Sequence, residues 1–176
     1  SLPRPGVPDA APLDPEALIR TLAKHGVQYV LIGALGARMQ GFPRVTADAD
    51  ITPARDPANV ERLAAALREL DAKVYTETVP EGLAFDCTPA MLGRADTWNL
   101  VTRAGRLDIA FVPSGTAGYA ELAATAAHFT VFEADLAVAR LEDILRSKIA
   151  ADRPKDRQDV LIIREMLARQ ASELRR

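Results

Sequence analysis

The sequence predicts an α/β (α+β) domain built on a mixed β-sheet, flanked by helices and followed by further helices at its C-terminal end. Three observations favour this class. Short apolar, β-branched segments alternate with amphipathic helical segments along the first half of the chain. A strand–turn–strand pattern occupies residues 98–112. Two helical segments, 141–151 and 155–174, end the chain, whose 176 residues suit one domain with its own core.

Start and stop signals give the order of the expected elements. Asp14 and Pro15 have the residue types of a helix N-cap and first turn, and Gly26 suits the end of that helix. The hairpin turn is expected at Ala104 and Gly105. The expected helices occupy residues 14–26, 34–40, 56–70, 119–127, 141–151 and 155–174. The expected strands occupy residues 27–32, 45–51, 74–75, 98–102, 106–112, 129–132 and 136–139.

These elements divide the chain into three expected parts. Residues 1–13 contain four prolines and little periodicity, so they are expected to form a mobile arm. Residues 14–140 are expected to form the core, which holds every predicted strand. Residues 141–176 are expected to form a helical segment that packs on this core.

The composition excludes some classes of protein. No run of ~20 apolar residues is present, so no membrane-spanning helix is expected. Cys87 is the single cysteine and can form neither an internal disulfide nor a cysteine-rich zinc site, so a cytoplasmic setting is expected. The net charge of −2 is not typical of a nucleic-acid-binding protein. Lysine and arginine are nevertheless common in the last third, and a local basic patch is sufficient to bind nucleic acid.

Asp48 and Asp50 form the strongest chemical signal. They lie two positions apart on an expected strand, so both carboxylates point to the same face. Burying two neighbouring negative charges is costly unless a positive charge lies between them. A divalent cation such as Mg²⁺ (or Mn²⁺) meets this need, because it prefers carboxylate, water and phosphate oxygens. Taken alone, an Asp-x-Asp pair also fits a solvated strand edge or a glycosyltransferase.

Asp108 is the candidate for a third carboxylate. It is a polar residue flanked by apolar ones on the expected strand 106–112. If this strand lies beside the strand of Asp48, the three carboxylates converge. Two metal ions ~4 Å apart could then activate an attacking hydroxyl and stabilise a leaving pyrophosphate.

A glycine turn between a strand and a short helix is the second signal. Gly33 directly follows the expected strand 27–32, and Ala34 is the first residue of the expected helix 34–40. Backbone N–H groups at a helix start attract phosphate, and glycine allows phosphate to approach the backbone. The segment lacks the G-x-G-x-x-G spacing of a dinucleotide site. A simple packing turn is the alternative.

Taken together, these motifs resemble the polymerase-beta-like nucleotidyltransferase superfamily. The resemblance covers roughly residues 27–165 and is closest to the minimal bacterial branch, which contains the AbiEii-like and mycobacterial Men-type toxins. Ala34 departs from the usual Gly or Ser, so phosphate contact there would rest on backbone N–H groups. The segments that carry the resemblance are Leu31-Ile32-Gly33-Ala34, Gly41-Phe42-Pro43-Arg44-Val45-Thr46, Asp48-Ala49-Asp50-Ile51, Leu141-Glu142-Asp143-Ile144-Leu145-Arg146-Ser147-Lys148 and Arg153-Pro154-Lys155-Asp156-Arg157-Gln158-Asp159.

The resemblance implies a role for each matching position. Asp48, Asp50 and Asp108 would hold the metal ions, and Asp108 would act as a base toward the acceptor hydroxyl. Lys148 would reach the nucleotide phosphates, as a compact cation on a long stem can. The other positions implied to bind the nucleotide are Gly33, Ala34, Arg38, Arg44, Thr46, Arg153, Lys155, Asp156 and Asp159. One of the last two carboxylates, which share a helix face, is expected to orient the lysine or contact the base.

The function expected from the resemblance is Mg²⁺-dependent transfer of NMP from an NTP, such as ATP, to an acceptor hydroxyl. The expected acceptor is the 3′ end of tRNA, and the expected biological role is the toxin of a toxin–antitoxin system. The expected partners are therefore an NTP, an RNA and a cognate antitoxin protein. One alternative is nucleotidylation of a small molecule, such as an antibiotic, or of a protein. The other is an inactive binding module, which would not require the three carboxylates.

Overall fold

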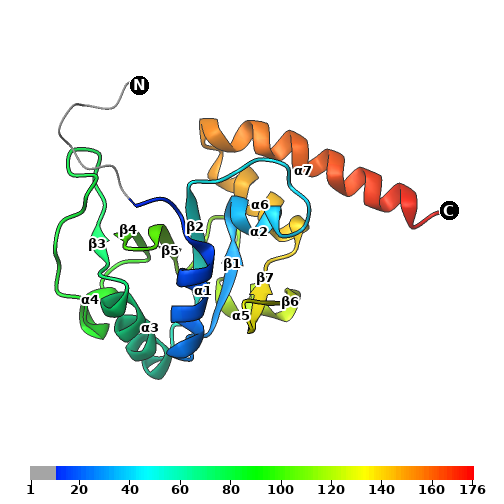
Figure 1. The fold of residues 1–176 in the computed structure, drawn as a ribbon. Coiled ribbons are helices and arrows are strands. Elements are labelled where there is room, and N and C mark those ends of the chain that lie inside the picture. The colour runs from blue at the N-terminus through cyan, green and yellow to red at the C-terminus, as the bar shows by residue number, and fades with distance from the viewer. Residues whose placement is uncertain (1–10) are drawn as a thin grey trace.

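The computed structural model describes residues 11–176 and has the predicted class of fold, a mixed sheet flanked by helices (Figure 1). The sheet has seven strands in the order β3-β4-β5-β2-β1-β7-β6. The strands are β1 (Tyr29–Ile32), β2 (Asp48–Pro53), β3 (Lys73–Val74), β4 (Thr97–Thr102), β5 (Gly105–Ala110), β6 (Ala127–Val131) and β7 (Ala134–Val138). The helices are α1 (Pro15–Lys24), α2 (Gly33–Arg38), α3 (Pro57–Glu69), α4 (Pro89–Leu92), α5 (Tyr119–Ala124), α6 (Leu141–Ala151) and α7 (Pro154–Glu173).

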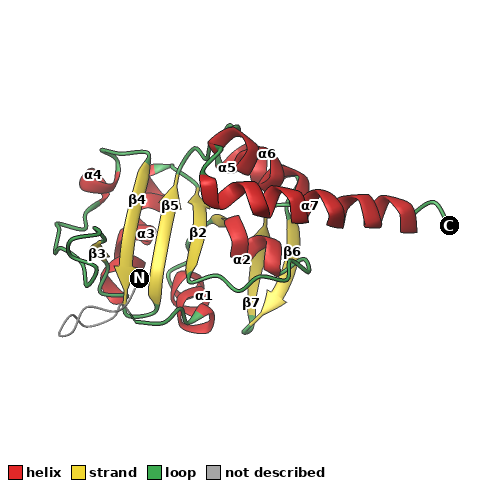
Figure 2. Cartoon of the chain, turned by 90° about the horizontal axis from the view of Figure 1, so that it is seen from above, coloured by secondary structure: helices red, strands yellow, loops and turns green. Residues whose placement is uncertain are grey.

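The sheet is covered differently on its two faces. One face carries the larger apolar core, formed with α1, α3 and α4. The other face carries a smaller core under α2, α5, α6 and α7, which includes Val30 of β1 but no residue of β4 or β5. Seen from above, β4 and β5 therefore lie beside the second group of helices and not beneath it (Figure 2).

Central strand β2 connects the two halves of the sheet. It pairs in antiparallel fashion with β1, where Ile32 is opposite Asp50, and in parallel with β5, where Asp50 is opposite Asp108. Buried Asn59 of α3 holds the start of β1 and the end of β2 together, because its side-chain amide forms hydrogen bonds of 2.7–2.9 Å with the backbone of Gln28 and Ala54. A satisfied buried amide of this kind makes the strand register specific.

Several predicted boundaries are wrong, among them the end of the strand predicted over 106–112, which lies at Ala110; three of the differences are explained by the structure. The second strand spans 48–53 and not 45–51, because the Thr46 hydroxyl bonds the backbone of Asp48 and so replaces ladder bonds with a local turn. The hairpin turn lies at Arg103 and Ala104, since Thr102 pairs with Gly105. The helix predicted over 119–127 ends at Ala124, and residues from 127 onward join the sheet by pairing with β7.

The predicted arm and the C-terminal segment are described in part. Residues 1–10 of the arm lie outside the described residues. Leu13 packs against the larger core, and the N–H of Asp14 donates to the carbonyl of Ala104 at 2.8 Å. Ile163 of α7 is fully buried, whereas the end of α7 projects from the body (Figure 1). None of the helices in residues 11–176 is both long and apolar enough to span a membrane.

Candidate metal and nucleotide site

Three carboxylates meet at the centre of the sheet. Asp48 and Asp50 lie two residues apart on β2 and face the same side, as the strand periodicity predicts. Asp108 lies on β5 in direct register with Asp50. One carboxylate oxygen from each residue lies within 4.8 Å of the others. The strand spacing thus creates a compact all-oxygen group able to hold a metal ion.

Electrostatic strain in this group is visible in its pKa values. Burial, followed by the charges of Asp48 and Asp108, raises the pKa of Asp50 to about 7. Burial likewise raises the pKa of Asp108 to about 6, although the neighbouring Arg106 charge opposes the change. Both shifts mean that the ionised carboxylates are destabilised where they stand. A bound cation would remove much of this cost, since it would lie between the negative charges.

Gly33, which was predicted to approach a phosphate, also packs against the carboxylate of Asp50. Its φ of +66° lies in the left-handed region, which favours glycine. A Cβ atom at this position would lie 2.8 Å from the carboxyl carbon of Asp50. The strand-to-helix turn therefore packs directly against the central carboxylate, and the missing side chain is what admits it.

Lys148 is the central residue of a group of basic side chains from α6 and α7 that faces the three carboxylates across the site. It projects from α6, is 8 % exposed, and donates from Nζ to Asp156 Oδ1 at 3.2 Å and Asp159 Oδ2 at 3.1 Å. The predicted orienting role is thus performed by both carboxylates and not by one. Arg153 bonds Asp156 through Nε at 2.7 Å, and burial of Asp156 is outweighed by these cations, so its pKa falls below the ordinary value. These contacts hold the lysine in a fixed place before any ligand binds.

The loop between α2 and β2 closes a further side of the site. Arg44 donates from Nη1 to Asp159 Oδ1 at 2.8 Å, which ties this loop to α7 across 115 residues of sequence. Thr46 donates to Asp48 Oδ1 at 3.0 Å and so orients the first carboxylate. The loop thereby joins the cationic and anionic walls.

A cavity of about 520 Å³ lies between these walls. That volume is within the range of ~300–1,000 Å³ typical of small-ligand sites. Most of the predicted site residues line it: Gly33, Ala34, Arg44, Thr46, Asp48, Asp50, Asp108, Lys148, Arg153, Lys155 and Asp159. Lys155 has no ion pair within residues 11–176, and its charge partly opposes the rise in the pKa of both Asp50 and Asp108. It therefore leaves an uncompensated positive charge beside the carboxylates.

Two predicted site residues do not line the cavity. Arg38 lies at the end of the short helix α2, and its Nη1 donates to the carbonyl of Pro43 at 3.4 Å on the surface. Asp156 is fully buried behind Lys148 and acts on the site only through that lysine and Arg153. The first position therefore lacks the predicted access to a nucleotide, and the second holds other residues in place.

Several lining residues had not been predicted. Ser147 precedes Lys148 directly, and Asn99 lies opposite Asp108 on the neighbouring strand β4. A hairpin turn placed at residues 103–104 would have given this register, so the signal for Asn99 was present in the sequence. Arg106 also touches the site, because its Nη2 lies 3.4 Å from Asp108 Oδ1.

Comparison with known proteins supplies no family for this chain. No protein-family model matches the sequence, and no curated protein matches it significantly.

Proposed function

We propose that this protein is a metal-dependent nucleotidyltransferase that moves an NMP group from an NTP to an acceptor hydroxyl. The observation that carries the proposal is the pairing of three convergent carboxylates with a wall of fixed cations across one cavity. Such a cavity suits a triphosphate bound with a divalent cation. The resemblance of residues 27–165 to nucleotidyltransferases agrees with this chemistry.

The carboxylate group fits Mg²⁺ or Mn²⁺. Asp48, Asp50 and Asp108 offer only oxygen ligands, and burial together with the neighbouring carboxylates raises the pKa of the last two despite the positive charges nearby. When bound, the metal would supply Lewis acidity toward the phosphates and the attacking oxygen. The oxygen-only donor set argues against zinc, which favours nitrogen and sulfur ligands.

The chain's own residues would supply position, charge and a proton acceptor. Lys148, Lys155 and Arg153 would bind the phosphate oxygens and neutralise their charge. The acceptor oxygen forms a bond to the α-phosphorus while the bond from that phosphorus to the bridging oxygen breaks, and pyrophosphate leaves with the electron pair. Asp108, on the β5 side of the carboxylate group, would take the hydroxyl proton, which is the role that the motif resemblance implies for it.

The 3′ end of an RNA, with tRNA as the first candidate, is the acceptor that we propose. The basic side chains of the cavity wall favour a polyanionic partner. A role as the toxin of a toxin–antitoxin system, with an antitoxin protein as partner, rests on the motif resemblance alone.

Incubation with α-labelled NTPs, one nucleotide at a time, would test the proposal. The reaction would contain Mg²⁺ and total tRNA, and Asp50→Asn would be the negative control. Label on RNA with wild type and none with the variant is expected. Label on a protein or a small molecule, and none on RNA, would show that one of the alternative acceptors is the substrate. The absence of label on any acceptor with all four nucleotides would contradict the proposed activity.

A further inference from the structure

The β4–β5 half of the sheet has a polar face that no helix of residues 11–176 covers. In Figure 2 the helices α2, α6 and α7 lie to one side of it, and α3 lies behind. Thr97 and Asn99 of β4 are exposed, although β4 is paired with β5 at both positions. Both also line the cavity, so this open face continues directly from the carboxylates.

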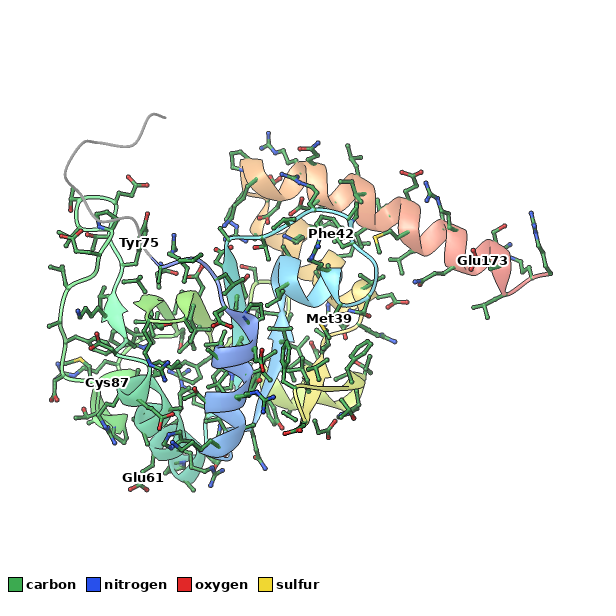
Figure 3. The ribbon with its side chains drawn as sticks, in the orientation of Figure 1. Met39, Phe42, Glu61, Tyr75, Cys87 and Glu173 are labelled. Atoms are coloured by element: carbon green, nitrogen blue, oxygen red, sulfur yellow. The ribbon has the colours of Figure 1, made fainter. Side chains whose placement is uncertain are left out.

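A stacked pair extends this face toward the sheet edge. The guanidinium of Arg106 lies over the ring of Tyr75, with 3.6 Å between its carbon and the ring centroid. Among residues 11–176, its hydrogen bonding is limited to Asp108, at 3.4 Å. Figure 3 shows Tyr75 on the β3 side of the molecule, far from Phe42 and α7. The pair thus places a partly exposed aromatic ring and a partly exposed positive charge beside Asp108.

The geometry of in-line displacement gives this surface a partner. The cations that would hold the triphosphate belong to α6 and α7, on the β1–β2 side of the carboxylates. The attacking oxygen must approach the α-phosphorus from the side opposite to the leaving pyrophosphate. In the sheet order, that opposite side is β5 followed by β4. The acceptor is therefore directed onto the open face and not under the helices.

Resting on the proposed function, we infer that the open face is the subsite for the 3′-terminal nucleotides of a single-stranded RNA end. Tyr75 and Arg106 form the platform, with the ring and guanidinium plane stacking on a base and the charge meeting a phosphate. Asn99 is in register with Asp108 and offers a donor and an acceptor to the terminal ribose or base.

Direct binding separates this subsite from the chemistry. The probe is a fluorescent 12-nucleotide single-stranded RNA with a free 3′ hydroxyl, titrated with protein in Ca²⁺. Tyr75→Ala is expected to weaken RNA binding about tenfold, since one stacked base is typically worth ~1–3 kcal/mol. Asn99→Ala removes hydrogen bonding, which is typically worth ~1 kcal/mol, and is expected to weaken RNA binding about fivefold. Tyr75→Phe keeps the ring and is expected to bind as the wild type does. The affinity of Tyr75→Ala for a labelled NTP is expected to change less than twofold, because Tyr75 does not line the cavity.

Arg55→Ala is the matched control. Arg55 also stacks on an aromatic ring, that of Phe111 at 4.6 Å, but Phe111 belongs to the core on the opposite face of the sheet. Its loss is expected to leave RNA affinity unchanged. Unaltered RNA binding by both alanine variants, with NTP binding retained, would overturn the subsite while leaving the proposed transfer intact. A wild type that binds this RNA no better than a double-stranded one would overturn it as well.

Discussion

Replacement of Asp50 by asparagine is expected to stabilise the metal-free protein while it abolishes transfer. The residue is the most strained member of the carboxylate group, because burial and two neighbouring carboxylates raise its pKa to about 7 from an ordinary value of 3.8. A neutral amide of the same shape removes that repulsion. Function and stability are therefore in conflict at this position, as is common at active sites.

The magnitude follows from the shift in pKa. At pH 8, the difference between 3.8 and about 7 corresponds to about 4 kcal/mol of destabilisation from the ionised carboxylate. Because the folded protein binds this proton more tightly than the unfolded chain does, its contribution to stability falls as the pH rises from about 4 to about 7. The amide loses part of the gain through its own burial, so we expect the variant to be about 2–3 kcal/mol more stable at pH 8.

Urea unfolding in EDTA at pH 5 and at pH 8 measures this difference. The advantage of Asp50→Asn is expected to be large at pH 8 and to shrink at pH 5, where wild-type Asp50 is protonated. Addition of Mg²⁺ at pH 8 is expected to stabilise the wild type and to have little effect on the variant. Exposed Asp86 provides the control, since Asp86→Asn should change neither value. A variant less stable than wild type at pH 8, with no pH dependence of the difference, would refute the reasoning.

Three further substitutions test other parts of the site. Gly33→Ala and Gly26→Ala place alanine at nearly the same positive φ, which costs about 1–2 kcal/mol of stability in each variant, but only the Gly33 variant collides with Asp50. Transfer activity should therefore be lost in Gly33→Ala alone, and equal activity of the two variants would contradict the packing of Gly33 on Asp50. Lys148→Met removes the cation that two buried carboxylates share, although Asp156 keeps Arg153 and Asp159 keeps Arg44. The free energy of unfolding in urea should therefore fall by about 2–3 kcal/mol, and NTP affinity should fall as well; unchanged stability would show that the ion pairs of Lys148 do not form. Asn59→Leu leaves the buried backbone groups of Gln28 and Ala54 unpaired, so calorimetry should show that the free energy of unfolding falls by about 3 kcal/mol. An unchanged stability would exclude the role of Asn59 in joining α3 to the ends of β1 and β2.

The carboxylate group could be predicted because its geometry is mostly local. The two-residue period of a strand places Asp48 beside Asp50, and the hairpin pattern places Asp108 in the middle of a strand. The proximity of these strands was an expectation that the sheet order confirms. Helix periodicity places Asp156 beside Asp159 on α7, and the short connection between α6 and α7 brings Lys148 to them.

Features that depend on distant segments could not be predicted. Arg44 meets Asp159 across 115 residues, and no local pattern encodes that contact. Arg38 was expected to reach the cavity, but its direction depends on how the short helix α2 rests on α6. The contact of Gly33 with Asp50 depends on the pairing of β1 with β2, which the sequence does not state. Tertiary packing decides each of these cases.

The most direct test of the central claim compares two positions of the label in the NTP. With Mg²⁺ and an RNA acceptor, α-labelled NTP is expected to leave label on the RNA, and γ-labelled NTP is expected to release it as pyrophosphate. Asp48→Asn, Asp50→Asn and Asp108→Asn should each abolish both signals. Transfer of the γ-label to an acceptor would make the protein a phosphotransferase, and full activity in any of the three variants would contradict the metal-site account.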